Sequence, residues 1–179
     1  EIVRIGTCGG MQEDIPLGTF LVSEKSIGWD GVLAFYEGRD EIADLGFEDA
    51  LVDFIHYPAK AARPYVVAAN PELVNRIAGD EMMRGCTIAA NGFYGPQGRV
   101  LRCDLAVKDI NERITDFRYE GQRITNYEME GSAIAGLSLL MGHKAMTVCC
   151  VIAQRKVEAA NTDYKPRIKQ LVQTVLERI

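Results

Sequence analysis

The sequence has little of what metal sites, disulfide frameworks and membrane spans require. Its 179 residues include only two histidines, His56 and His143, without spaced partners, so we expect no metal site. No apolar run reaches the roughly 20 residues of a membrane-spanning helix, so we expect no membrane partner. The cysteines are odd in number and form no Cys-x-x-Cys pair, which is typical of reduced thiols in a cytoplasmic protein. They are Cys8, Cys86, Cys103, Cys149 and Cys150.

Positive charge is also scarce. The chain has 20 Lys and Arg against 25 Asp and Glu, a formal net charge of −5 and a pI of about 5.1. Nucleic-acid-binding domains usually carry a basic surface, so we expect no nucleic-acid partner. The net charge does not decide against a small anionic ligand, because a few local arginines can hold one.

The remaining composition is that of an ordinary globular protein, with 47% hydrophobic and 25% charged residues. The length is sufficient for one domain with a core. The chain opens directly on the strand-like run "EIVRIGTCGG", and an interior strand normally has neighbours before it. We therefore expect residues 1–179 to form a single domain that is incomplete at its N-terminus.

Strand-like and helix-like segments alternate along the chain, which predicts a layered α/β domain. Several of the strand-like runs are continuously apolar, as in strands buried on both faces. Helices are predicted over 70–79, where Asn70 is the N-cap, from about 131 to 142, and near the C-terminus. The stretch 30–62 is ambiguous, and its prolines indicate irregular chain. The predicted strands are 2–6, 19–23, 65–69, 86–90 and 146–153.

The first candidate site is "RIGTCGG", residues 4–10, in which a strand is predicted to end in a glycine-rich turn. Backbone N–H groups in such a turn can approach an anion closely, and Gly6 allows that approach. Thr7 adds a hydroxyl donor, and Arg4 adds a guanidinium that can bind phosphate through two hydrogen bonds. The alternative is a tight structural turn beside a surface arginine.

The second candidate is "GFYGPQGR", residues 92–99. If the chain is extended there, Gln97 and Arg99 point to the same side. Gln97 supplies a donor and an acceptor and Arg99 supplies donors, a set that suits an imide edge such as that of uracil. Phe93 could stack on a flat ring or pack on a sugar. The alternative, favoured by the composition alone, is a solvated hairpin loop.

The third candidate is "NYEMEG", residues 126–131. If residues 127–130 are extended, Glu128 and Glu130 project to one side and Met129 to the other. Glu130 then lies at the start of the helix predicted from 131, where the helix dipole favours a carboxylate. Such a carboxylate can accept hydrogen bonds from a vicinal diol. The alternative is a first helical turn with acidic residues, which is common.

The fourth candidate is "VIAQRK", residues 151–156, where a buried strand passes abruptly into polar residues. Ligands of open α/β sheets tend to lie beyond the carboxyl ends of strands. Gln154 or Arg155 could line such a site. The alternative is a strand that leaves the core into solvent.

Together, the four stretches resemble the nucleoside phosphorylase family, and its uridine phosphorylase branch in particular. "RIGTCGG" is similar to the phosphate-binding element of that family, and "FYGPQGR" to its uracil-recognition loop. "NYEMEG" resembles its ribose-binding element, and "VIAQR" the strand whose terminal arginine borders the base pocket. The resemblance implies an α/β/α domain with a central mixed sheet flanked by helices. It covers essentially the whole chain and lacks only the family's N-terminal third.

The resemblance also implies a role for each residue. Phosphate would bind Arg4, Gly6 and Thr7, and the ribose would bind Thr7, Glu128, Met129 and Glu130. The base would bind Phe93, Gln97, Arg99 and Arg155, and the catalytic set would be Arg4, Gln97, Arg99 and Glu130. The implied reaction is phosphorolysis of uridine to uracil and ribose 1-phosphate in nucleoside salvage. Phosphate is a co-substrate, no cofactor is implied, and the implied assembly is a homo-oligomer, either a dimer or a hexamer of dimers.

Three other functions compete with this interpretation. A purine nucleoside phosphorylase, or a nucleosidase of the same fold that uses water, would be expected to place an aspartate just after the strand that ends near Ala153. Here Gln154, Arg155 and Lys156 follow, and no carboxylate occurs before Glu158, although Asp163 could fold back. A nucleoside-binding protein without catalysis is the rival from another class.

Overall fold

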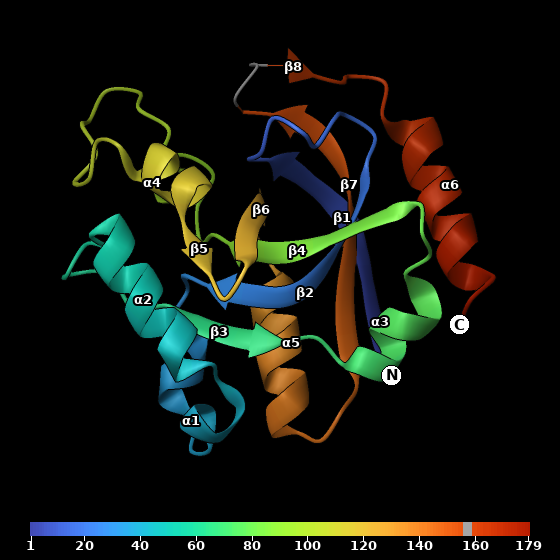
Figure 1. Ribbon diagram of the computed structural model, residues 1–179, viewed down its shortest axis with the longest axis horizontal. Helices are drawn as coiled ribbons and strands as arrows, with labels where there is room; N and C mark the ends of the chain where they lie inside the picture. Colours follow the sequence, from blue (N-terminus) through green and yellow to red (C-terminus); the bar gives the residue numbers. More distant parts are fainter. Residues whose placement is uncertain (156–158) are drawn as a thin grey trace.

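The centre of the molecule is a twisted mixed β-sheet with helices around it (Figure 1). The computed structural model describes residues 1–155 and 159–179. Within these residues the strand order is β3-β2-β4-β6-β1-β7-β8, and β5 pairs with β6. The strands are β1 (Ile2–Gly10), β2 (Phe20–Gly28), β3 (Tyr65–Ala68), β4 (Met82–Ala89), β5 (Arg118–Tyr119), β6 (Gln122–Glu128), β7 (Ala145–Gln154) and β8 (Ala159–Ala160).

The sheet curls so that β2 and β7, which lie near opposite ends of the strand order, also pair with each other. β1 and β7 are parallel, as are β2 with β4 and β4 with β6, whereas β1 and β6 are antiparallel. β2 also pairs antiparallel with β7, so β2, β4, β6, β1 and β7 form a ring. The expected fold class, α/β with a central mixed sheet flanked by helices, is confirmed.

The five apolar runs predicted as strands overlap β1, β2, β3, β4 and β7, but the sequence did not predict β6. This strand holds Thr125 and Asn126 in the middle of the sheet, and both are buried. The hydroxyls of Thr125 and Thr87 lie 2.9 Å from Asn126 Oδ1 and can donate to it, whereas Asn126 Nδ2 is buried without a hydrogen-bond partner among the described residues. Because these buried residues are polar, β6 lacks the continuous apolar run by which the other central strands are recognised.

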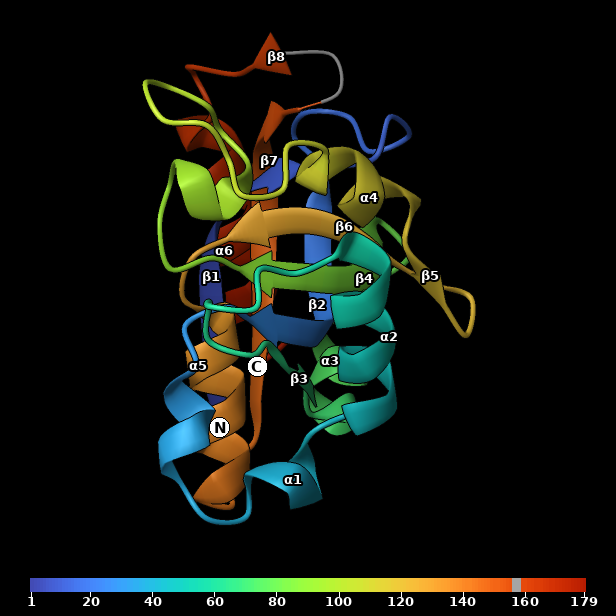
Figure 2. The same ribbon diagram turned by 90° about the vertical axis from the view of Figure 1, so that its left-hand side faces the viewer.

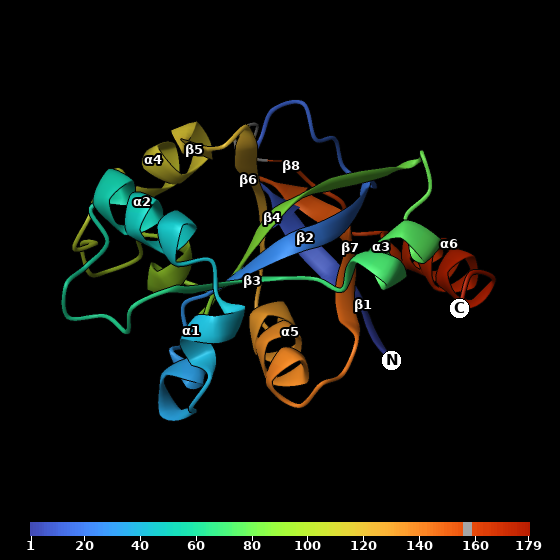
Figure 3. The same cartoon turned by 60° about the horizontal axis from the view of Figure 1, so that its bottom comes forward.

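Helices cover the sheet on opposite sides (Figure 3). α3 and α6 pack on β1, β2 and β7, and their core includes Val148, Leu171 and Val175. α2 and α4 lie on the other side, over a core that includes Phe47 and Ile114. The helices are α1 (Arg39–Ile42), α2 (Leu45–Ile55), α3 (Pro71–Ile77), α4 (Ile110–Asp116), α5 (Gly131–Leu140) and α6 (Lys165–Leu176), with the 3₁₀ turns η1 (Val32–Phe35) and η2 (Gly95–Gln97).

The predicted starts of α3 and α5 agree with the structure, whereas each helix ends two residues before the predicted position. Asn70 caps α3 through its side chain, which accepts a hydrogen bond from Leu73 N at 3.1 Å. α5 runs beside α1 and beneath β3 (Figures 1 and 2), and Gly142, with a φ of 71°, follows its end. No helix in the described ranges has the length and hydropathy needed to cross a membrane.

The ambiguous stretch 30–62 contains a helix that the sequence analysis did not resolve. α2 is capped by Asp44, whose carboxylate accepts a hydrogen bond from Phe47 N at 3.0 Å. Its buried face repeats every four residues, at Phe47, Leu51 and Ile55, but the buried Glu48 interrupts the apolar pattern. Glu48 is accommodated because it pairs with Arg39 at 2.5 Å and accepts a hydrogen bond from Val66 N.

Candidate active site

A cavity of about 260 Å³ lies where β1, β6 and β7 end, and most of the predicted site residues meet in it. Those that line it are Arg4, Thr7, Phe93, Gln97, Arg99, Glu128, Met129 and Glu130. Gly6 and Arg155 lie outside its lining. A larger hollow of about 940 Å³, between η1 and α2, holds none of the predicted residues, and its Arg39 is already paired with Glu48.

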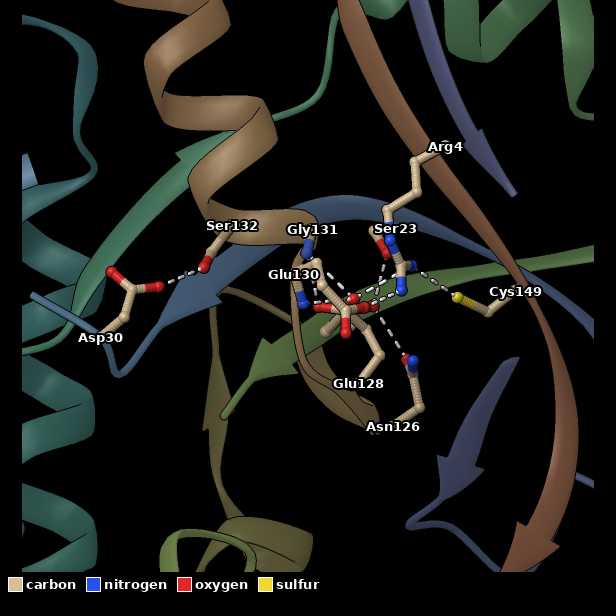
Figure 4. A network of polar contacts seen from close by, with 10 residues as sticks. Arg4, Ser23, Asp30, Asn126, Glu128, Glu130, Gly131, Ser132 and Cys149 are labelled. Carbon is tan, nitrogen blue, oxygen red and sulfur yellow. Dashed lines mark hydrogen bonds and ion pairs between the residues drawn. The ribbon is translucent and has the colours of Figure 1, made fainter. Parts of the chain in front are cut away.

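Arg4 reaches from β1 toward two carboxylates at the start of α5 (Figure 4). Its Nη1 lies 3.0 Å from Glu128 Oε2 and donates to Cys149 Sγ at 3.4 Å, while its Nη2 pairs with Glu130. Burial opposes the positive charge of Arg4, but Glu128, Cys149 and Glu130 outweigh it, and the pKa of Arg4 is raised. The guanidinium therefore stays charged in a half-buried position, where it can meet an anion.

The glycine-rich turn predicted at residues 4–10 is wrong, because β1 continues through it to Gly10. The strand pairs with β7 along this length, with Gly6 opposite Cys149 and Gly10 opposite Gln154, and its register shifts by one residue between Cys8 and Gly9. Gly6 instead makes room for the arginine, since a Cβ there would lie 2.9 Å from Arg4 Nη1. Residues two apart on a strand share a face, so a side chain at Gly6 would displace Arg4.

The extended conformation predicted for 127–130 is also wrong, because β6 ends at Glu128 and the chain bends into α5. The bend still brings both carboxylates to Arg4. Glu128 is buried and accepts hydrogen bonds from the backbone N–H groups of Glu130 and Gly131, at 3.0 and 2.9 Å. The predicted carboxylate at the helix start is thus supplied by two residues, with Glu128 bound to the backbone and Glu130 paired with Arg4.

The two carboxylates differ in exposure and so in what they can do. The side chain of Glu128 is 1% exposed and that of Glu130 is 60% exposed. Burial raises the pKa of Glu128, although Arg4 and the two backbone N–H groups partly offset the effect of burial. Glu130 is therefore the carboxylate that can accept hydrogen bonds from a ligand in the cavity.

The opposite wall of the cavity is an irregular loop rather than an extended segment. η2 turns the chain, and Gly98 follows it with a φ of 68°, so the predicted strand-like alternation of Gln97 and Arg99 is wrong. The two side chains meet through the turn instead, because Arg99 Nη1 donates to Gln97 Oε1 at 2.7 Å. The Arg99 guanidinium stacks 3.8 Å from the centroid of the Phe93 ring and donates to the Phe93 carbonyl.

Arg155 lies behind this loop and holds Gln97 from the far side. Its Nη1 donates to the carbonyl of Gln97 and its Nη2 to Gln97 Oε1, both at 2.6 Å. The guanidinium also lies 4.7 Å from the centroid of the Tyr127 ring. Burial, and then the charge of Arg99, lower the pKa of Arg155 to about 10, so it is cationic at neutral pH. Gln97 Oε1 thus accepts from two guanidinium groups, which turns the amide nitrogen away from both.

Sequence reasoning did not single out Asn111, which also holds the loop. Its amide donates to the carbonyls of Gln97 and Gly98, at 3.3 and 3.2 Å. It lies on α4, outside all four stretches, and no local pattern marks it. Gln154, by contrast, is buried and donates to the carbonyls of Gln12 and Ile15, so it fixes the β1–β2 connection.

A purine-specific relative would be expected to place an aspartate just after β7, so the carboxylates beyond the end of this strand help to decide which base the site could accept. Asp163 is exposed and does not line the cavity, while Lys156 and Glu158 lie outside the described residues. Within the described residues, no cluster of three or more His, Cys, Asp or Glu side chains could hold a metal ion.

Comparison with known proteins matches almost the whole chain to one family. The model of the family described as "Phosphorylase superfamily" matches residues 1–178. The chain belongs to the phosphorylase superfamily. The superfamily match therefore includes both walls of the cavity, from Arg4 to Arg155.

Curated relatives within the superfamily are named as uridine phosphorylases. Uridine phosphorylase A of Schistosoma mansoni is 41% identical over 161 residues, which cover 86% of this chain and 47% of that protein. Uridine phosphorylase of Thermococcus kodakarensis is 26% identical over 155 residues, 86% of this chain and 48% of that protein. The chain thus spans about half the length of the curated relatives it matches.

Solved structures of the superfamily share the fold. A nucleoside phosphorylase of Trypanosoma brucei, described as showing uridine phosphorylase activity, superposes with a TM-score of 0.79 at 24% identity. That match covers 98% of this chain and 63% of the other. A uridine phosphorylase of Phytophthora capsici has a TM-score of 0.68 at 17% identity, covering 99% of this chain and 64% of the other.

Proposed function

We propose that this protein is a uridine phosphorylase, which splits uridine with inorganic phosphate into uracil and ribose 1-phosphate in nucleoside salvage. One observation carries the proposal: a single cavity holds the arginine–carboxylate cluster of Arg4 on one side and the Gln97–Arg99 pair on the other. The first suits an anion beside a sugar, and the second suits a flat base with two carbonyl groups. The uridine phosphorylases among the relatives support the same substrate.

Phosphate would bind at Arg4, with the hydroxyl of Thr7 as a second donor and Gly6 keeping the strand surface clear. A phosphate oxygen would take the place of Glu130 at Arg4 Nη2. Glu130 would then be released to accept hydrogen bonds from the ribose hydroxyls, with Met129 against the sugar. Glu128 would remain with Arg4 and the start of α5, closing the same site.

The base would lie against Phe93 with its carbonyl groups toward Gln97 and Arg99. Because Gln97 Oε1 already accepts from Arg99 and Arg155, the Gln97 amide nitrogen is the group left to donate to a carbonyl. Arg99 retains further N–H donors for the second carbonyl. Arg155 would act on the base through Gln97 rather than by direct contact.

The chemistry needs positioned charge rather than a nucleophilic side chain. As the glycosidic bond lengthens, positive charge develops on the sugar and negative charge spreads over the uracil carbonyls. Gln97 and Arg99 would stabilise the leaving uracil, a preorganised electrostatic effect. Glu130 would fix the sugar while phosphate attacks the opposite face with inversion, so that the C–N bond breaks and a C–O bond forms. Phosphate is consumed as co-substrate, and the proposed reaction uses no cofactor.

A purine substrate is disfavoured because the described residues at and beyond the end of β7 bring no carboxylate to the cavity. Gln154 and Arg155 are engaged with backbone carbonyls, and Asp163 does not line the cavity.

We further propose that the protein acts in the cytoplasm as a homo-oligomer, a dimer or a hexamer of dimers. Light scattering after size exclusion would test this assembly, and a monomer at micromolar concentration would contradict it.

An absorbance assay on the protein in its natural length tests the proposed function. Uridine, thymidine and inosine are each incubated with and without phosphate, and base release is followed. We expect uridine cleavage that requires phosphate. Cleavage of inosine but not uridine would indicate a purine phosphorylase, and phosphate-independent release would indicate a nucleosidase. Tight uridine binding by calorimetry without turnover would indicate a binding protein.

A further inference from the structure

We infer that Asn111 is a positioning residue for the reaction, which holds the loop 92–99 so that Gln97 and Arg99 face the base. The inference rests on the proposed function. Asn111 does not line the cavity, so it acts through the loop and not by contact with a substrate. The inference is supported by hydrogen bonds at both ends of the Asn111 side-chain amide.

The nitrogen end of the amide binds the turn on which Arg99 depends. Nδ2 donates to two consecutive carbonyls, those of Gln97 and Gly98, at 3.3 and 3.2 Å. The amide lies directly against Gly98, since a Cβ added there would overlap it. Gly98 has a φ of 68°, and this left-handed residue sets the direction in which the chain reaches Arg99.

The oxygen end of the amide is oriented from within the sheet. Tyr127, on β6, donates its hydroxyl hydrogen to Asn111 Oδ1 at 3.3 Å. An amide that accepts from Tyr127 at one end must present its NH₂ group at the other, toward the loop carbonyls. The hydroxyl–amide contact therefore selects the rotamer that holds the turn.

The helix that carries Asn111 is itself fixed. Ile110 and Ile114 bury α4 in the core beneath it, and the Thr115 hydroxyl donates to the Asn111 carbonyl at 2.8 Å. The loop, by contrast, has no strand partner in the described chain. Asn111 thus transfers the rigidity of a packed helix to an irregular loop, and displacement of reacting groups by about 1 Å can cost roughly 100-fold in rate.

The variant Asn111→Asp tests the inference with little change of shape. An oxygen replaces the NH₂ group, so it faces the Gln97 and Gly98 carbonyls without a hydrogen to donate, while the acceptor for Tyr127 is kept. Asn111→Ala removes the contacts without adding charge. Asn75→Asp on α3 is the matched control, because it makes the same change at an exposed position far from the cavity.

Two readouts separate positioning from general damage. For Asn111→Asp we expect kcat with uridine to fall by up to about 100-fold while the KM for phosphate is unchanged. The kcat ratio of 5-fluorouridine to uridine should rise, because 5-fluorouracil leaves as a more stable anion and depends less on Arg99. Equal losses with both substrates, or a raised KM for phosphate, would overturn the inference.

Hydrogen exchange tests the contact without any turnover. We expect backbone amides in 93–99 to exchange faster in Asn111→Asp and Asn111→Ala than in Asn75→Asp, with β1 and β6 unchanged. Unchanged exchange of the loop would overturn the inference. If the wild-type protein does not cleave uridine, the proposed function fails, but the exchange result still decides whether Asn111 holds the loop.

Discussion

The two walls of the cavity are built by different means. The strand half, consisting of Arg4, Thr7, Glu128, Met129 and Glu130, comes from β1, the end of β6 and the start of α5. The loop half, consisting of Phe93, Gln97 and Arg99, comes from a segment without a strand partner in the described chain. Backbone pairing positions the first half, whereas side chains that bind backbone carbonyls position the second, from Asn111 and Arg155.

The halves also differ in charge. In the strand half two carboxylates balance one guanidinium, which raises the pKa of Arg4 despite its burial. In the loop half two guanidinium groups share one amide oxygen, and burial lowers the pKa of both Arg99 and Arg155. A cavity with an unbalanced cation on the base side suits a base that leaves as an anion.

The largest expected effect is on the strand half, from removal of its cation. Arg4→Met leaves the buried Glu128 carboxylate without its ion pair, and breaking a buried pair costs about 3–5 kcal/mol. We expect the free energy of unfolding, measured in urea, to decrease by an amount that approaches this cost. The double variant Arg4→Met/Glu128→Gln should recover most of the loss, since no unpaired charge remains. Wild-type stability in the single variant would contradict the ion pair.

In the loop half, we expect removal of the Arg99 guanidinium to lower the rate of turnover without lowering the free energy of unfolding. Loss of one donor to a developing anion typically raises the activation free energy by on the order of 2.7–4 kcal/mol. Arg99→Ala should therefore lower kcat for uridine by the factor that corresponds to this increase. Steady-state kinetics and urea unfolding of the same preparation measure both quantities. If turnover is normal and only the KM for uridine rises, the leaving-group role of Arg99 is wrong.

A pair of glycine substitutions compares the two halves directly. Gly98→Ala forces a left-handed φ on alanine and overlaps Asn111, so we expect a loss of about 1–2 kcal/mol in stability and slower turnover. Gly6→Ala meets only the flexible end of Arg4, which can shift without leaving Glu128 unpaired, so we expect a smaller loss of stability than in Arg4→Met and a higher KM for phosphate. Equal effects on phosphate KM from both variants would contradict the separation of the halves.

The smallest expected effect is a pH dependence of stability that arises from Glu128. Its pKa in the folded protein is raised above the ordinary 4.5, so the folded state binds more protons than the unfolded state between those two values. Stability contributed by protonated Glu128 is therefore complete below pH 4.5 and is lost as pH rises through the folded pKa. In urea unfolding across this range, the stability of Glu128→Gln should fall less with rising pH than that of the wild-type protein, and an identical pH dependence in both would contradict the assignment.

The sequence predicted those parts of the molecule that depend on local pattern. Continuous apolar runs predicted β1, β2, β3, β4 and β7 but not β6, and Asn70 marked the start of α3. The residues of the site came from a family resemblance, and the cavity brings most of them together. Their local conformations were predicted wrongly, because the Glu128 carboxylate binds the backbone of the following bend and distant side chains bind the turn at Gly98. Asn111 and Arg155 reach the loop from other elements, and no spacing within residues 92–99 could indicate them.

The central claim is that the strand half handles phosphate and the loop half handles uracil in one reaction. Phosphorus NMR of the protein in its natural length, incubated with uridine and phosphate, tests this claim most directly. The account predicts that the phosphate signal declines as a ribose 1-phosphate signal of inverted configuration grows, in step with uracil. Accumulation of uracil with no change in the phosphate signal would contradict it.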